Sequence, residues 1–354
     1  MPRLDRLQSI WGCRAMALRA MGHVDRTGFR NRTSPPTTWL LSSRHVPHHA
    51  LARLALAVAA YCIGATELAT TGPLPRIADG VRRSTDRTPH NHDNRTGEHS
   101  MGPLDGRTAL VTGASRGIGR AIAQRLAADG ALVAVHYNTD EASARRTVDH
   151  ITENGGAAFP LPGPLGTAGD VDRVYQRLDE ALARRGLPIT LHVLVNNAGH
   201  NTHGSIHTVR PDDFDHLINV HAKAPLFLIQ QALPRLPDHA RIINITSAAT
   251  RVALPTSLAY TMAKAALQSL SPTLAKELGT RSITINNIAP GVTQTDLNKH
   301  RWETPEARAQ NAQHTALQRV GHPTDIADIA AFLASDQARW ITGQTIDATG
   351  GSHL

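Results

Sequence analysis

The side chains best suited to chemistry are Tyr260 and Lys264, which lie four positions apart in the segment Ser257–Leu267. Residues four apart on a helix share a face, so the phenol and the ammonium can enter one site. A free phenol has a pKa of about 10 and protonates a reacting oxygen poorly near neutral pH. A fixed positive charge beside it stabilises the phenolate and lowers that pKa. The pair predicts acid–base catalysis; a core-edge tyrosine beside a solvated lysine is the alternative.

A glycine-rich turn offers a second kind of site. The apolar run Thr108–Thr112 predicts a buried parallel strand, and residues 120–129 predict an amphipathic helix. Gly113, Gly117 and Gly119 lie in the turn between them. Such a turn places backbone N–H groups and the positive end of a helix against a pyrophosphate. The spacing differs from G-x-G-x-x-G, and glycines that serve packing alone are the alternative.

The end of the next strand, Ala131–Tyr137, bears on the choice of dinucleotide. In NAD-binding Rossmann units an acidic residue at this place binds the ribose 2′-hydroxyl. Here Asn138 follows the strand, and Arg116 in the glycine turn offers a fixed charge for a 2′-phosphate. The pattern predicts NADP as the cofactor, with NAD as the alternative because Asp140 and Glu141 disfavour a phosphate.

Strands and helices alternate along the rest of the chain, which predicts a parallel sheet with helices on both faces. We expect an α/β fold with a single doubly wound Rossmann domain and a mostly parallel seven-stranded sheet. The further strands are expected at residues 157–159, 190–195, 241–247, 282–291 and 342–351, and the further helices over residues 170–185 and 211–236 and around Tyr260.

Taken in order, the polar and glycine motifs of these segments resemble the short-chain dehydrogenase/reductase family. The resemblance runs from about residue 105 to residue 351. Within the family, the sequence pattern is most similar to that of the 3-oxoacyl-carrier-protein reductases. Tyr260 follows Ser247 by 13 positions, which matches the family in spacing as well as order. The motifs are Thr112–Gly119, Asn196–Gly199, Asn219, Ser247, Tyr260 with Lys264, and Pro290–Gly291.

The resemblance implies an oxidoreductase that reduces a carbonyl to a secondary alcohol, or the reverse, through four catalytic residues. Tyr260 would be the general acid in reduction, and Lys264 would lower its pKa and hold the nicotinamide ribose. Ser247 would hydrogen-bond the carbonyl oxygen, where negative charge grows. Asn219 would bend its helix and hold a water that links Lys264 to solvent. Without the other motifs, the simpler interpretation is that Ser247 is a turn residue at the end of a strand and Asn219 a polar residue on a helix surface.

The resemblance also implies a set of cofactor-binding residues and one departure from the family. Pro164 stands where the family has an aspartate that receives the adenine amino group, so only the backbone of Leu165 can serve there. The expected cofactor-binding residues are Gly113, Ser115, Arg116, Gly117, Ile118, Gly119, Asn138, Asn197, Ala198, Gly199, Tyr260, Lys264, Pro290, Gly291 and Thr295.

Charge and cysteine content separate the first hundred residues from the rest. Residues 1–100 hold 14 arginines, no lysine and seven acidic residues, whereas residues 101–354 carry a net charge of only +1. The basic balance therefore gives no reason to expect nucleic-acid binding by the folded part. Both cysteines, Cys13 and Cys62, lie in the first hundred residues, and no histidine spacing suggests a metal site. A cytoplasmic location fits this pattern.

We expect residues 1–100 to be a disordered or vestigial extension and residues 101–354 to form the Rossmann domain. The apolar run over residues 54–65 is shorter than the about 20 residues of a membrane span, so no membrane association is expected. Residues 57–75 resemble part of the first transmembrane segment of major facilitator superfamily antiporters, which suggests a fusion remnant.

The sequence leaves open two alternative functions and the oligomeric state. A nicotinamide-nucleotide-binding regulator without turnover would use the same fold, but such proteins commonly lose the tyrosine or the lysine, and both are present here. A membrane-anchored protein would need the run over residues 54–65 to enter a bilayer. By resemblance, the partners are a small carbonyl or alcohol substrate and further copies in a homodimer or homotetramer, assembled through the helices of Asn219 and Tyr260.

Overall fold

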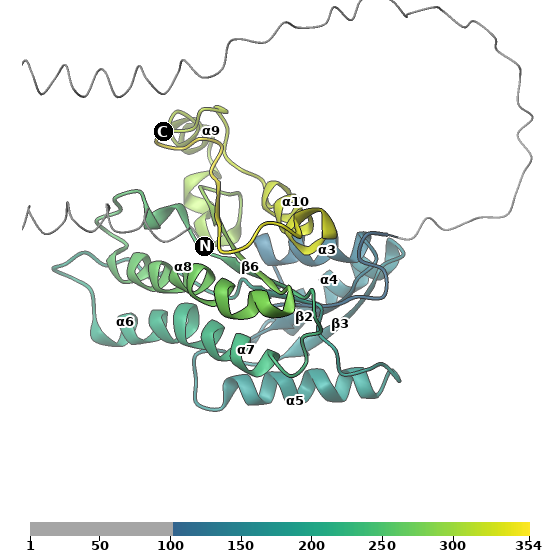
Figure 1. Ribbon diagram of the computed structural model, residues 1–354. Coiled ribbons are helices and arrows are strands. Elements are labelled where there is room, and N and C mark those ends of the chain that lie inside the picture. The colour runs from purple at the N-terminus through teal and green to yellow at the C-terminus, as the bar shows by residue number, and fades with distance from the viewer. Residues whose placement is uncertain (1–101) are drawn as a thin grey trace, which may run out of the picture. The chain divides into compact units, whose positions relative to one another are not determined.

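The computed structural model describes residues 102–354 (Figure 1). The expectations about residues 1–101, including the antiporter-like stretch and the boundary after residue 100, lie outside the described residues.

A seven-stranded sheet forms the centre of the described part, in the order β3-β2-β1-β4-β5-β6-β7. Each neighbouring pair is parallel, so the predicted α/β Rossmann architecture is confirmed and the sheet is parallel throughout. The central strands are continuous apolar runs because both faces of the sheet are covered. The strands are β1 (Thr108–Val111), β2 (Leu132–Tyr137), β3 (Ala157–Pro162), β4 (Val193–Asn196), β5 (Arg241–Ile245), β6 (Thr284–Pro290) and β7 (Thr345–Ala348).

Helices cover both faces of this sheet (Figure 1). One face packs against α3, α4 and α10, through an apolar layer that includes Ile122, Leu126 and Ile326. The other face packs against α5, α7 and α8, through a layer that includes Val174, Leu228 and Leu278. The α-helices are α3 (Gly117–Ala128), α4 (Glu141–Glu153), α5 (Asp170–Ala183), α6 (Pro211–Ile218), α7 (Ala224–Ala232), α8 (Leu258–Leu278), α9 (Pro305–Ala312) and α10 (Pro323–Ala334).

Strand β3 is longer than the three residues expected from the sequence. It runs on through Pro160 and Pro162, which lie opposite Val135 and Tyr137 of β2. Proline lacks the N–H that a central strand must donate, but β3 is an edge strand and needs partners on one side only.

The helix expected over residues 211–236 is interrupted rather than continuous. Between α6 and α7 the chain forms a π-helix, η1 (Asn219–Lys223), in which Ala224 N–H bonds to the carbonyl of Asn219. Pro225 follows directly, and proline in a helix removes a backbone donor. Single π-turns inside α-helices occur often at functional sites.

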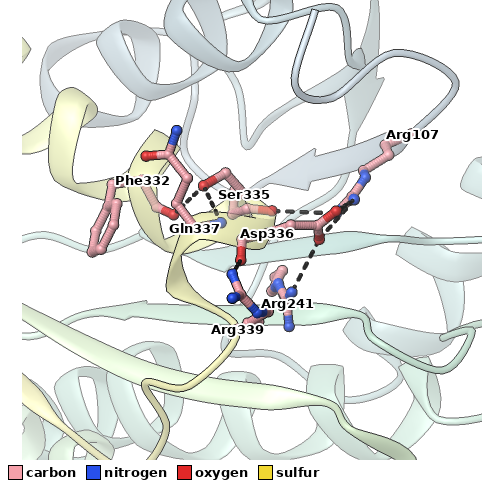
Figure 2. Close-up of polar contacts among 8 residues, drawn as sticks. Arg107, Arg241, Phe332, Ser335, Asp336, Gln337 and Arg339 are labelled. Carbon is pink, nitrogen blue, oxygen red and sulfur yellow. Dashed lines mark hydrogen bonds and ion pairs between the residues drawn. The ribbon is translucent and has the colours of Figure 1, made fainter.

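At the amino-terminal end of β5, an ion-pair cluster fixes the segment that follows α10 (Figure 2). Arg107 donates to both carboxylate oxygens of Asp336 at 2.9 Å, and Arg241 reaches the same carboxylate at 3.2 Å. Arg241 is buried, with only 2% of its side chain exposed. The Ser335 hydroxyl accepts from Gln337 N and caps the short turn η5 (Asp336–Ala338). These contacts anchor the chain before it enters β7.

Candidate active site

One cavity of about 1000 Å³ opens where the carboxyl ends of the strands meet. Its lining includes residues that follow β1, β2, β4, β5 and β6, which is where open parallel sheets bind ligands. Every residue of the predicted cofactor set contributes to this lining, as do the predicted catalytic residues Ser247, Tyr260 and Lys264. Of the site residues predicted within the described part, Asn219 alone is missing from it.

Lys264 is a buried cation, with 4% of its surface exposed. It lies on α8, and its Nζ donates to the carbonyl oxygen of Ile245, the last residue of β5, at 2.7 Å. The nitrogen lies 5.8 Å from the centroid of the Tyr260 ring. Burial lowers the pKa of Lys264 to about 7, because a charged amine loses its hydration there. The ammonium has three N–H donors, and the structure gives a protein partner to one of them.

Tyr260 lies one helical turn before Lys264, with the Ser247 side chain near its phenol. Burial raises the pKa of the Tyr260 phenol above its ordinary value, and the nearby Ser247 side chain opposes that rise. Lys264 was expected to lower this pKa. In this structure the main effect on the pKa is instead the loss of hydration that a buried phenolate would suffer. Ser247 lies two residues after the end of β5, and its hydroxyl accepts from Ala249 N at 3.1 Å.

His221, two residues beyond Asn219, takes the place in the cavity where Asn219 was expected. Its ring is 2% exposed and meets the Tyr260 ring edge-on, with centroids 5.5 Å apart. Asn219 instead uses its backbone carbonyl to close the π-turn. The sequence reading missed His221, because only the π-turn decides which residue of this segment faces the cavity.

The glycine turn after β1 fits a phosphate-bearing cofactor. Within residues 102–354 no side chain caps the first turn of α3, so its backbone N–H groups remain available at the cavity wall. A Cβ on Gly119 would lie 2.3 Å from the Gly113 carbonyl oxygen, so this glycine is required for close packing. Gly117 has φ +57°, a conformation that glycine adopts without strain.

His136, at the end of β2, supports this turn and was also missed. Its Nδ1 accepts from Gly113 N at 3.2 Å, and its carbonyl accepts from Ala114 N at 2.8 Å. Burial lowers the pKa of His136 to about 4, so the ring is neutral and can accept. A histidine at the end of a buried strand next to the glycine turn was the available signal.

The two carboxylates that follow β2 are engaged within α4. Asp140 is the N-cap of that helix and accepts from Ser143 N at 3.0 Å. That hydrogen bond is the main cause of the lowered pKa of Asp140. Glu141 pairs with Arg145 one turn later at 2.6 Å. Arg116, by contrast, is exposed on the cavity wall beside them.

The segment after β6 forms one wall of the cavity. Thr295 precedes the 3₁₀ segment η4 (Asp296–Arg301), and its hydroxyl donates to Asn298 Oδ1 at 2.8 Å. Trp302 Nε1 donates to the Thr295 carbonyl at 3.0 Å, so this indole is used in packing. Leu165 also lines the cavity, next to Pro164.

Neither a metal site nor a membrane span is found in residues 102–354. Histidine, cysteine and acidic side chains do not gather there in groups of three able to hold a metal ion. The helices of this part are too short or too polar to cross a bilayer.

Sequence and structure comparisons place this architecture in a known family. Residues 113–353 match the family model described as enoyl-(acyl carrier protein) reductase, a branch of the short-chain dehydrogenases/reductases. The chain belongs to the short-chain dehydrogenase/reductase family, as the resemblance of its motifs implied.

Among the solved structures, the chain is similar to the angucycline C-6 ketoreductase LanV with bound NADP. The two share 47% identity with a TM-score of 0.68, over 72% of this chain and 98% of LanV. It is also similar to LugOII, a promiscuous reductase that catalyses keto-reduction at C1 during lugdunomycin biosynthesis, with 46% identity and a TM-score of 0.69 over 71% of this chain and 100% of LugOII. A curated relative, the 3-oxoacyl-[acyl-carrier-protein] reductase of Staphylococcus aureus, is 36% identical over 70% of this chain and 98% of its own length.

Proposed function

We propose that this protein is an NADP-dependent ketoreductase that converts a ketone to a secondary alcohol. The observation that carries the proposal is the meeting of Ser247, Tyr260 and buried Lys264 in one cavity with the glycine turn. NADPH, when bound, would supply the hydride. The intact tyrosine and lysine favour this function over a nucleotide-binding regulator without turnover.

Each of the three side chains has a role that its surroundings support. Ser247 would donate to the substrate oxygen, where negative charge grows as the carbonyl is reduced. Tyr260, whose phenol lies near Ser247, would give its proton to that oxygen. The two N–H groups of Lys264 that have no protein partner in the described residues would hold ribose hydroxyls and donate toward the Tyr260 oxygen.

NADP is the dinucleotide that the surroundings of β2 favour. Asp140 caps α4 and Glu141 pairs with Arg145, so one oxygen of each carboxylate is already engaged, which disfavours binding of a ribose 2′-hydroxyl there. Arg116 is exposed at the same wall and would pair with a 2′-phosphate. Bound NADP in LanV, which shares 47% identity with this chain, supports the same choice.

The substrate is a bulky ketone of the angucycline kind. The cavity of about 1000 Å³ is large enough to take a dinucleotide's reactive half together with a ring system. LanV and LugOII, the two ketoreductases described above, are 46–47% identical to this chain.

The proposal is tested by titrating the full-length protein with NADPH and with NADH, followed by nucleotide fluorescence. Rabelomycin, the compound bound in a second LanV structure, then serves as the ketone, with product identified by mass. We expect tighter binding of NADPH and formation of a product two hydrogens heavier. Tighter binding of NADH would contradict the role of Arg116, and binding without reduction of any ketone would favour the regulator.

We also propose that the chain assembles as a homodimer or homotetramer through α7 and α8. Leu226 and Phe227 on α7 and Met262 on α8 are exposed apolar side chains, which supports burial of these helices against another copy. Light scattering of the full-length protein, compared with a Phe227→Glu variant, measures the assembly: the variant should be smaller, and an unchanged mass would contradict this interface.

A further inference from the structure

Beside Tyr260, three histidines form a row that runs from the buried site to the surface. His221 is buried against Tyr260, His200 lies 5.8 Å from His221, and exposed His216 lies 4.6 Å from His200, measured between ring centroids. All three rings line the cavity that holds Tyr260 and Lys264. They come from η1, the loop after β4, and α6, so the fold and not sequence proximity brings them together.

The position of the His221 ring is fixed tightly. Its Nε2 lies 2.7 Å from the carbonyl oxygen of His200. A Cβ on Gly199 would lie 2.1 Å from the Cε1 atom of the ring, so the imidazole can occupy this place only because residue 199 is glycine. A ring held so closely by its neighbours has little freedom to turn away from Tyr260.

The hydrogen bond to His200 decides which nitrogen of His221 carries the proton. Nε2 also lies 3.3 Å from the backbone N of His200, but its contact with the carbonyl oxygen is the shorter one. A carbonyl oxygen only accepts, so we assign Nε2 as the donor, and the neutral ring then presents Nδ1 as an acceptor. Nδ1 is buried and has no hydrogen-bond partner among the described residues. Buried polar atoms are normally paired, so this atom points to a partner that arrives with water or substrate.

Lys264 supplies the complementary half of this arrangement. Two of its three N–H donors have no protein partner in the described part, and it is a positive charge that faces His221 across the same cavity. The other titratable groups near the row are Tyr260 on α8 and Asp213 on α6, which faces His200. A buried donor without an acceptor and a buried acceptor without a donor therefore share one site.

We propose that His221 links the Tyr260–Lys264 pair to solvent, the role that the family resemblance would give to Asn219. The proposal rests on the ketoreductase function above. Tyr260 loses one proton to the substrate oxygen in each turnover, and the phenolate regains it from Lys264. Lys264, now a neutral amine, takes a proton from a water that donates its other hydrogen to Nδ1 of His221, and a proton that arrives from bulk solvent along the cavity past His200 and His216 restores that water. His221 is thus a positioning residue that holds this water beside Lys264.

The test compares His221→Leu, which removes the acceptor, with His221→Asn, whose side-chain oxygen can stand near the position of Nδ1. His207→Leu, at an exposed histidine outside the cavity, is the matched control. Rabelomycin reduction by NADPH is followed in H₂O and D₂O. We expect His221→Leu to be slower by about tenfold with a larger solvent isotope effect, and His221→Asn to recover most of the rate. Equal rates for His221→Leu and the control would overturn the proposal.

A second measurement needs no turnover and so separates this proposal from the function itself. The ¹⁵N signals of His221, assigned by their loss in His221→Asn, report its tautomer, and absorbance titration reports the Tyr260 phenolate against a Tyr260→Phe reference. We expect the Nε2–H tautomer and a higher Tyr260 pKa in His221→Leu than in His221→Asn. A Nδ1–H tautomer, or the same Tyr260 pKa in both variants, would overturn the relay even if the wild-type protein reduces ketones.

Discussion

A buried cation lies at each end of strand β5, Arg241 of the strand itself and Lys264 of α8, and the two have different partners. At the amino-terminal end, Arg241 is 2% exposed and shares the Asp336 carboxylate with Arg107 (Figure 2). At the carboxyl end, Lys264 is 4% exposed and bonds only to the backbone carbonyl of Ile245. Burial lowers the pKa of both side chains, but only Arg241 has a carboxylate that opposes the shift.

The difference fits a structural role for Arg241 and the proposed catalytic role for Lys264. A buried charge normally has an ionic partner, because desolvation is otherwise too costly. Arg241 has such a partner in Asp336, whereas Lys264 has none within the described residues. Under the proposed function, the Lys264 ammonium would stabilise the negative charge that develops on the Tyr260 oxygen and would bind the ribose hydroxyls of the cofactor.

Replacing each cation by an apolar side chain of similar length should give the largest difference between the two ends of β5. Lys264→Met should lower kcat for ketone reduction by about 10²- to 10⁴-fold, the range expected for loss of acid–base function. Arg241→Met is the matched change at the other end of β5 and should keep kcat within about twofold, because it lies away from the cavity. Steady-state kinetics with NADPH measure both, and a large loss of kcat in Arg241→Met would contradict the separation.

The pH dependence of stability should carry the signature of Lys264. Its folded pKa of about 7 lies below its ordinary value of 10.5, so between these values the unfolded chain binds more protons than the folded one. The free energy of unfolding should therefore rise with pH across this window, by up to about 1.4 kcal/mol per pH unit from this group. Below about pH 7 the cost of burying the ammonium is fully present.

Urea denaturation at several pH values measures this term as the difference between the wild-type protein and Lys264→Met. The variant lacks the titrating group. The free energy of unfolding of the wild type minus that of the variant should therefore rise as the pH rises from 7 to 10.5. A difference that does not change over this range would show that the wild-type Lys264 keeps an ordinary pKa.

Removing the carboxylate from the amino-terminal cluster should affect stability and leave chemistry alone. Asp336→Asn takes away the only ion-pair partner of Arg241 within the described residues. The free energy of unfolding should fall by about 1 to 3 kcal/mol, at the modest end for a buried pair because the Asp336 side chain is itself 66% exposed. Urea titration reads the loss, with Asp328→Asn, at an exposed pair on α10, as the control. A lowered kcat at unchanged stability would be the opposite of this expectation.

The smallest effect is expected at the adenine side of the cavity. Pro164→Asp would restore the side-chain acceptor that the family places there, and a single hydrogen bond should tighten NADPH binding by about fivefold. Pro188→Asp, at an exposed loop, is the control. An unchanged dissociation constant for Pro164→Asp would mean that the backbone near Leu165 already serves the adenine.

Much of the fold could be predicted from the sequence because its signals are local. The apolar runs of β1, β4 and β6 and the glycines between β1 and α3 each specify their own conformation. The extension of β3 through Pro160 and Pro162 could not be predicted in the same way, because whether proline is tolerated depends on the strand's place at the sheet edge.

The site divides in the same way. Ser247, Tyr260 and Lys264 were predictable because a strand end and a helical spacing of four fix their directions. That His221 and not Asn219 lines the cavity could not be predicted, because it depends on the π-turn that begins at Asn219. The partner of Asp140 depends on where α4 begins, since this carboxylate caps that helix. The partner of Asp336 depends on packing between segments far apart in the sequence.

The central claim is that Tyr260 delivers the proton in an NADPH-dependent ketone reduction. A single-turnover experiment tests it most directly: full-length wild-type protein and Tyr260→Phe are each saturated with NADPH, mixed with rabelomycin, and followed at the nicotinamide absorbance. The account predicts rapid loss of absorbance in the wild type and a rate about 10²- to 10⁴-fold lower in Tyr260→Phe, both measured at saturating NADPH. Equal rates in the two proteins would contradict it.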